Sequence, residues 1–206
     1  MKTNPNQRHT NKGFTLIEMI GVLAVIAILA ALLVPKIFEA INNAKINNAA
    51  LSLNTVKTAI ADHYAKCGSL LVDAKGAAIP LGPGYDAKLL EEGFLDKPLA
   101  VKITTGTNVV VATRSISTLT PGSTVDGTSA TGYALAGGAT NQVVGATVVE
   151  ATLFQVNAAD ARDLSERMDG SELTETGTTS ADVNGRVKYA QPVNGIATVY
   201  VYLTHR

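Results

Sequence analysis

Residues 13–35 read GFTLIEMIGVLAVIAILAALLVP, and this stretch decides the fold of the chain. From Phe14 to Val34 it has 21 residues. At about 1.5 Å per residue they make about 31 Å of α-helix, which matches the thickness of a bilayer core. The only charged residue in the stretch is Glu18. A carboxylate inside lipid needs a partner and marks a functional position by default. We therefore expect a transmembrane helix with one residue that does more than anchor it.

The residues before this stretch form a short basic leader. Residues 1–13, MKTNPNQRHTNKG, hold three Lys or Arg side chains, no acidic residue and no apolar run. A basic segment before an apolar one stays on the cytoplasmic side of the membrane. A secretory signal would be cut after its apolar region, but the apolar run here exceeds the usual length of about 7–15 residues. Hydropathy alone indicates a plain membrane anchor.

The sequence GFTLIE at residues 13–18 resembles the N-terminal motif of type IV pilins and type II secretion pseudopilins, and the likeness extends to Pro35. In that family a prepilin peptidase cleaves after the glycine and methylates the new N-terminal residue. The resemblance therefore implies cleavage between Gly13 and Phe14, with N-methylation of Phe14. It also implies a partner for Glu18, the charged amine at the N-terminus of a neighbouring subunit. A register slip would leave both charges unpaired, so Glu18 would set subunit register and not act as a catalyst.

Pro35 has two interpretations. Because proline lacks an N–H and clashes with the preceding turn, we expect a kink or an unwound stretch near residues 28–35. Hydropathy alone would end the membrane helix at Pro35. The resemblance favours a kink within a continuous helix, in a segment that is often unwound in assembled filaments of the family.

Helical periodicity continues beyond the membrane stretch. Apolar residues recur every three or four positions between residues 46 and 64, which is typical of one face of an α-helix. Gly68 suits the left-handed position that ends such a helix. The helix from Phe14 to Lys66 would be about 80 Å long. We expect its second half to pack on the chain's own sheet and not in a coiled coil. The predicted stripe is Ile46, Ala49, Leu53, Val56, Ile60 and Tyr64.

The remaining residues predict an α+β head, with the long helix laid across an antiparallel sheet. We divide the chain into a leader at 1–13, a transmembrane and filament-core helix at 14–35, its amphipathic continuation at 36–67 and a globular head at 68–206. The elements expected in the head are a connector at 70–84, a two-turn helix at 85–93, strands or apolar runs at 101–104, 109–113, 133–135 and 143–155, a turn at 121–122, a helix at 158–168 capped by Asn157 and closed near Gly170, and a hairpin of 187–190 with 196–203 around Asn194-Gly195.

No motif for catalysis, a cofactor or a metal is present, so we expect a protein that is not an enzyme. The three histidines, His9, His63 and His205, are not expected to cluster, and we place His63 and His205 on the surface. The single cysteine, Cys67, rules out both an internal disulfide and a cysteine-built metal site; we expect it to be a small buried residue. The acidic residues between 160 and 182 indicate a solvated face more than a calcium site.

The charge balance points away from nucleic acid. The chain has 17 basic and 17 acidic residues, and removal of the leader leaves 14 basic residues against 17 acidic ones, a net charge of −3. No block of like charge is present. We expect no specific nucleic-acid partner.

Three functions agree with these observations. The resemblance implies first a structural subunit of a type IV pilus, held in the inner membrane as a precursor and then part of a cell-surface or periplasmic filament. Its partners would be identical subunits, prepilin peptidase, the inner-membrane assembly machinery and, before assembly, the membrane. The alternatives are a pseudopilin of a type II secretion system and a membrane-anchored binding domain that never polymerises.

Overall fold

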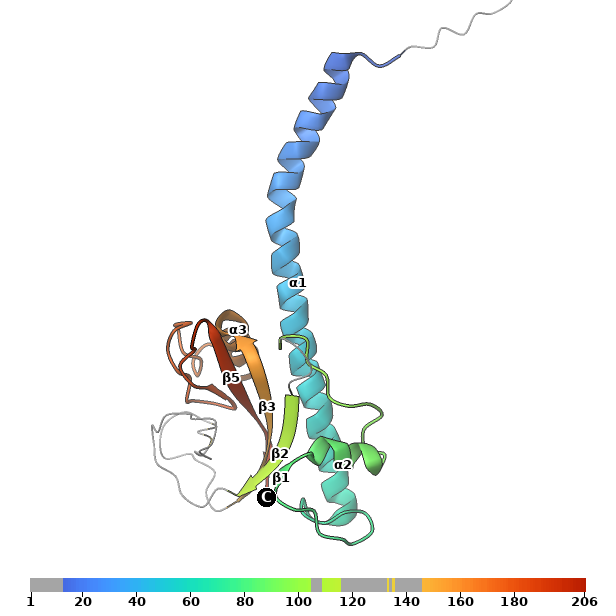
Figure 1. Cartoon of the computed structure of the whole chain (residues 1–206), viewed down its shortest axis with the longest axis vertical. Helices are drawn as coiled ribbons and strands as arrows, with labels where there is room; N and C mark the ends of the chain where they lie inside the picture. Colours follow the sequence, from blue (N-terminus) through green and yellow to red (C-terminus); the bar gives the residue numbers. More distant parts are fainter. Residues whose placement is uncertain (1–12, 105–108, 116–132, 134, 136–145) are drawn as a thin grey trace, which may run out of the picture. The chain divides into compact units, whose positions relative to one another are not determined.

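The computed structural model describes residues 13–104, 109–115, 133, 135 and 146–206. The chain divides into two compact units, Met1–Asn42 and Asn43–Arg206, and each is described by itself (Figure 1). Most of the leader, the turn expected at 121–122 and the start of the apolar run at 143–145 lie outside the described residues.

The long helix α1 spans Leu16–Cys67, which is 52 residues. It passes through Pro35, and residues 28–35 are helical throughout. The continuous helix is therefore confirmed, and an end of the helix at Pro35 is wrong. The stretch before the proline is not unwound in the single chain. At the other end Gly68 has φ 72°, and its N–H donates to the Tyr64 carbonyl at 2.8 Å, as the sequence predicts for a left-handed cap.

The second unit is an α+β domain, which confirms the predicted class. The described residues of this unit form a five-stranded sheet of order β1-β2-β3-β5-β4 with antiparallel pairing throughout. Figure 1 shows α2 near the C-terminal end of α1 and α3 beside the sheet. The elements of this unit after α1 are β1 (Gly82–Pro83), α2 (Tyr85–Glu91), β2 (Val109–Ser115), β3 (Thr147–Asn157), α3 (Ala158–Asp169), β4 (Val187–Tyr189) and β5 (Ile196–His205).

The C-terminal part of α1 supplies one wall of the main core. Leu53 and Ile60 are fully buried there, in one cluster with Val149 of β3 and Val201 of β5. Packing on the chain's own sheet is therefore confirmed. Tyr64, the last member of the predicted stripe, is only half-buried.

The last strand, β5, buries both of its faces. Alternate residues Ala197, Val199, Val201 and Leu203 belong to the main core with α1. Tyr202 points to the other side of the sheet, where it packs with Tyr133 and Val148, because successive side chains of a strand face opposite ways.

That second face of the sheet holds a buried polar group. The Glu150 carboxylate accepts a hydrogen bond from the Tyr133 hydroxyl at 2.9 Å and pairs with Arg114 at 2.6 Å. The Lys188 ammonium lies over the Tyr133 ring, 5.2 Å from its centroid. Burial lowers the pKa of Lys188 to about 8, although the Glu150 and Asp182 carboxylates act in the opposite direction.

Local signals in the sequence predicted the caps and the hairpin. Asn157 Oδ1 accepts from the Ala159 N–H at 3.0 Å at the start of α3. Asn194 and Gly195 have φ of 53° and 75°, as a type I′ turn requires, and they join β4 and β5 as expected.

Two predictions about the sheet need correction. Residues 101–104 are not a strand but a turn, in which the Thr104 hydroxyl donates to the Val101 carbonyl at 3.1 Å. Only Thr104 forms a β-bridge, with Val156. Conversely, Gly82 and Pro83 of the connector form a short edge strand, with Gly82 opposite Thr113. Proline is tolerated at a sheet edge, where its missing N–H breaks no ladder.

Candidate functional site

The residues at the expected cleavage position precede the helix. Gly13 and Phe14 lie outside α1, and the Phe14 side chain is 80% exposed. The bond between them therefore lies in non-helical backbone directly before the first turn.

Thr15 and Glu18 form a capping box at the start of α1. The Thr15 N–H and the Thr15 hydroxyl each donate to Glu18 Oε2 at 2.8 Å, and the Glu18 N–H donates back to Thr15 Oγ1 at 3.3 Å. This reciprocal arrangement satisfies backbone donors that the first turn of a helix leaves unpaired. The sequence reasoning missed it, although the spacing T-x-x-E before an apolar run is its known signal.

An exposed apolar surface follows the capping box. Residues 13–41 are exposed throughout, and this part of α1 is long and apolar enough to cross a membrane, with none of it buried. A stretch of this kind needs lipid or other apolar helices around it. The large exposed side chains are Phe14, Leu16, Ile17, Met19, Ile20, Val22, Leu23, Val25, Ile26, Ile28, Leu29, Leu32, Leu33, Val34, Ile37, Phe38 and Ile41.

Pro35 lies apart from the other expected site residues. Gly13, Phe14 and Glu18 are together at the helix start, whereas Pro35 is 17 positions after Glu18 in the same helix, about 26 Å further along its axis. An ion pair between Lys36 and Glu39 at 3.2 Å follows it. Pro35 therefore does not contact the site at the helix start.

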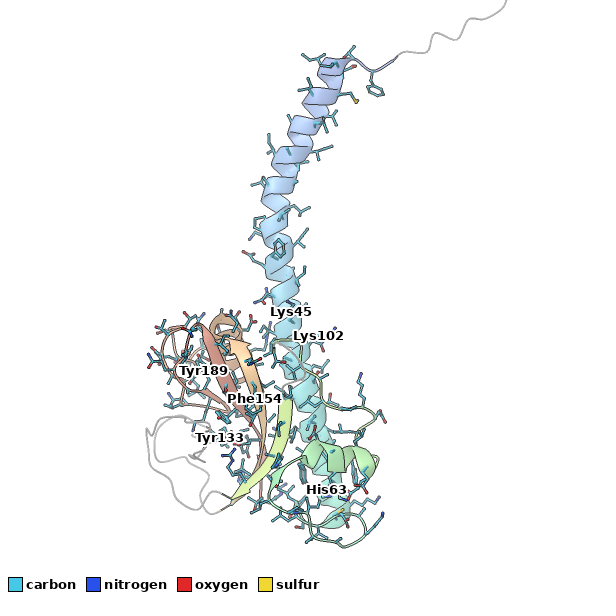
Figure 2. The ribbon with its side chains drawn as sticks, in the orientation of Figure 1. Lys45, His63, Lys102, Tyr133, Phe154 and Tyr189 are labelled. Atoms are coloured by element: carbon cyan, nitrogen blue, oxygen red, sulfur yellow. The ribbon has the colours of Figure 1, made fainter. Side chains whose placement is uncertain are left out.

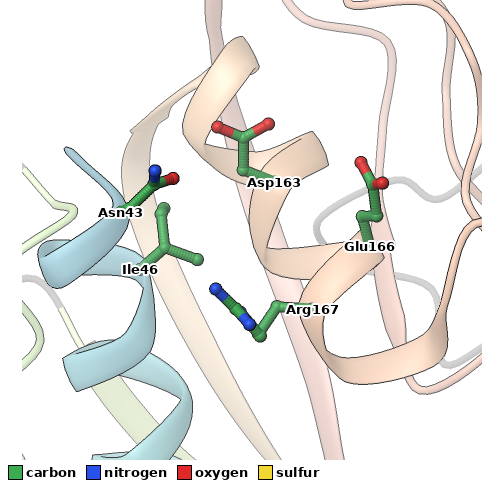
Figure 3. Close-up of a pocket in the computed structure, with 5 residues that line it drawn as sticks. All are labelled: Asn43, Ile46, Asp163, Glu166 and Arg167. Atoms are coloured by element: carbon green, nitrogen blue, oxygen red, sulfur yellow. The ribbon is translucent and has the colours of Figure 1, made fainter. Parts of the chain in front are cut away.

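Two of the acidic residues between 160 and 182, Asp169 and Asp182, accept hydrogen bonds from the protein itself, and Glu166 pairs with Arg162 at 3.6 Å. Asp163 and Glu166 line a pocket together with Arg167, and Asn43 and Ile46 of α1 complete it (Figure 3). The prediction of a solvated acidic face is wrong for Asp182, which is 1% exposed and accepts a hydrogen bond from Ser165 at 2.8 Å.

Asp169 is likewise occupied by hydrogen-bond donors. Its carboxylate accepts from the backbone N–H groups of Arg186 and Val187, both at 2.7 Å, and from Arg186 Nε at 3.0 Å. Arg186 Nη2 also donates to the Met168 carbonyl. These contacts hold the loop between α3 and β4 against the end of α3.

His63 is the clearest error of the sequence reasoning, because it is not on the surface but fully buried. It lies on α1 (Figure 2), with Nδ1 at 3.2 Å from the Tyr85 hydroxyl and Nε2 at 3.3 Å from Glu92 Oε2. The Phe94 ring packs edge-on against it, 5.3 Å between centroids. A signal for its burial was available, since His63 follows Ile60 by three residues and therefore falls on the apolar face.

Comparison with known proteins agrees with the N-terminal geometry. Residues 8–34 match the family model described as the prokaryotic N-terminal methylation motif. No solved structure matches the chain significantly. The matched residues include the expected cleavage position, the capping box and most of the exposed apolar part of α1. The chain thus carries the prokaryotic N-terminal methylation motif, which is the signature of the precursors of type IV pilins and pseudopilins.

Proposed function

We propose that this protein is a structural subunit of a type IV pilus, made as an inner-membrane precursor and assembled through its N-terminal helix. The observation that carries the proposal is the methylation motif at residues 8–34, because it begins an apolar helix that is exposed to residue 41. Such a surface fits lipid in the precursor and sister helices in a filament.

Processing would create the group that pairs with Glu18. In this proposal the leader at 1–13 stays cytoplasmic, prepilin peptidase cuts between Gly13 and Phe14, and Phe14 becomes N-methylated. The new amine would then lie one residue before Thr15. Glu18 is held at the same end of the helix by its two hydrogen bonds from Thr15, which supports a charge-assisted contact with the amine of a neighbouring subunit.

Each region of the processed chain would have its own place in the proposed filament. Residues 14–35 would form the filament core, 36–67 would continue the helix and 68–206 would form the head. The partners are identical subunits, the peptidase and the assembly machinery of the inner membrane. The filament would lie at the cell surface or in the periplasm, and the chain would catalyse no reaction.

Shearing of the producing cells tests the proposal. The released material is examined by electron microscopy and its N-terminal peptides by mass spectrometry. Long surface filaments built of a chain that begins with methylated Phe14 are expected. A processed chain without surface filaments would identify a type II secretion pseudopilin, which shares the motif and the helix. An uncut chain would contradict both and leave a membrane-anchored binding domain.

A further inference from the structure

We propose that His63, Cys67 and Glu92 bind one Zn²⁺ ion at the C-terminal end of α1. One imidazole nitrogen, the Cys67 sulfur and one carboxylate oxygen lie within 4.8 Å of one another. The proposed site lies entirely in the unit Asn43–Arg206, and it does not depend on the proposed pilus function.

The spacing of the three residues suits a shared ion. His63 and Cys67 are four residues apart on α1, which places them on the same face of the helix. Glu92 reaches them from the end of α2, where it is the last residue before the left-handed Gly93, φ 77°. In a tetrahedral zinc site the ligand atoms lie about 3.3–3.7 Å apart, so small side-chain rotations would bring the three atoms to coordination distance.

Two buried polar atoms at this position make no hydrogen bond. They are His63 Nε2 and Glu92 Oε2, which face each other at 3.3 Å. His63 is fully buried, and the Glu92 side chain is 9% exposed. The two atoms lie close together without the geometry of a hydrogen bond, and an ion between them would give each of them a partner.

A further polar contact orients each of two proposed ligands, His63 and Glu92. The Tyr85 hydroxyl lies 3.2 Å from His63 Nδ1; when Nδ1 carries the proton and donates to it, Nε2 has a free lone pair for a metal. The other oxygen of Glu92, Oε1, accepts from the Ala74 N–H at 3.1 Å. Histidine ligands of metals are commonly oriented by such a second hydrogen bond.

The chemistry of the three groups favours zinc over calcium or magnesium. Imidazole and thiolate are ligands that Zn²⁺ prefers, whereas Ca²⁺ and Mg²⁺ take oxygen ligands. Cys67 is partly exposed, so the prediction of a buried cysteine is wrong, and the proposed site lies near the protein surface. Binding replaces the thiol proton by the metal and releases that proton to solvent. Water would complete a four-coordinate site.

Bound zinc would tie the end of α1 to α2 and close the connector between them. A single cysteine cannot form an internal disulfide, so the ion would take the place of a covalent link in this part of the head. An ion that binds only the folded chain stabilises it by mass action, in proportion to the logarithm of its concentration.

The test uses the full chain, purified in detergent with a tag that contains no histidine, stripped with EDTA and kept reduced. Zn²⁺ is titrated in competition with a chromophoric chelator. We expect one ion per chain, and an affinity that falls more than about ten-fold in Cys67→Ser and in Glu92→Gln. The matched control is Glu91→Gln, because Glu91 neighbours Glu92 but pairs with Lys88 at the surface; it should bind as the wild type does.

Two further readouts keep the result clear. Co²⁺ in place of Zn²⁺ should give the charge-transfer absorption of a thiolate–metal bond in the wild type and in Glu91→Gln, but not in Cys67→Ser. Zn²⁺ should also slow alkylation of Cys67 in the wild type, a measurement that needs no variant. Absence of binding, equal affinity in all four proteins, or an unchanged alkylation rate overturns the proposal and leaves His63 and Glu92 as a buried polar pair.

Discussion

Thr15 holds the Glu18 carboxylate at the start of α1, donating to Oε2 from both its backbone N–H and its hydroxyl at 2.8 Å. Glu18 therefore has a hydrogen-bond partner within its own chain. The capping box stabilises the first turn, and it fixes the direction of the only charged side chain between Phe14 and Val34. The helix start and the proposed register contact thus depend on the same two residues.

Replacement of Glu18 by alanine should separate processing from assembly. We expect Glu18→Ala to insert into the membrane and to be cleaved, but to give little filament, because in the proposed filament the amine of the neighbouring subunit would lose its partner. Thr15→Ala removes the hydroxyl but keeps the carboxylate, and it should assemble better than Glu18→Ala. Immunoblots of membrane and sheared fractions measure both steps. A normal filament yield from Glu18→Ala would contradict the assigned role.

Two leucines on α1 test the packing of the helix on the sheet. Leu53 is fully buried and Leu51 is 66% exposed. We expect Leu53→Ala to lower the free energy of unfolding of the head by about 2–5 kcal/mol, the usual cost of a cavity in a core. Leu51→Ala should change it by less than about 0.5 kcal/mol. Urea unfolding in detergent, followed by the near-UV circular dichroism of the tyrosines, compares them; equal losses would contradict this packing.

The loop between α3 and β4 should depend on Gly185. This residue has φ 73°, and a Cβ added there would overlap the Asp169 carboxylate, which anchors Arg186 and Val187. Gly185→Ala should therefore destabilise the head by at least about 2 kcal/mol, through left-handed strain and disturbed hydrogen bonds.

Gly177 in the same loop provides the control for Gly185. A Cβ at Gly177 would make only an ordinary contact, 3.4 Å from Ser180 Oγ. The same urea unfolding measurement should find Gly177→Ala close to the wild type. If the two alanine variants were equally stable, Asp169 would not hold the loop as described.

Lys188 should make the head more stable as the pH rises from 7.5 to 9.5. Burial lowers its folded-state pKa from 10.5 to about 8, so the unfolded chain binds more protons in this window and the unfolding free energy increases with pH. The free energy of unfolding therefore decreases as the pH falls through the folded-state pKa of Lys188. The expected gain from this lysine is about 2 kcal/mol over the window.

The variant Lys188→Met isolates this effect, because it keeps the length of the side chain without the charge. The difference in unfolding free energy between the wild type and Lys188→Met should show only the pH dependence that Lys188 causes. Above about pH 10 tyrosine ionisation in the unfolded state acts in the opposite direction, since burial raises the pKa of Tyr133 well above its ordinary value. Unfolding at pH 7.5 and 9.5 tests the claim, and parallel changes in both proteins would contradict it.

Features that depend on neighbouring residues could be predicted from the sequence. The stripe from Ile46 to Ile60, the Asn157 cap and the Asn194-Gly195 turn follow from helical period, capping and turn chemistry. The structure agrees with each of them. The T-x-x-E box at Thr15–Glu18 was readable by the same means and was overlooked.

Features that depend on distant residues could not be predicted. The strand at Gly82–Pro83 exists because its partner lies at Ala112–Thr113 in β2. No local sequence pattern in the connector predicts a strand there. The juxtaposition of His63 with Glu92 needs the turn after α2 to return the chain to α1. Counting cysteines along the chain likewise cannot show that Cys67 lies near His63 and Glu92 in the folded protein.

The mass of the N-terminal peptide of the chain recovered from membranes of the producing cells tests the central claim most directly. The account predicts a peptide that begins at Phe14, lacks residues 1–13 and carries one added methyl group on its amine. Gly13→Val should keep the leader, because the residue before the cut is changed, while the chain still inserts. Recovery of the wild-type chain with residues 1–13 intact, or cut after the apolar stretch, would contradict the account.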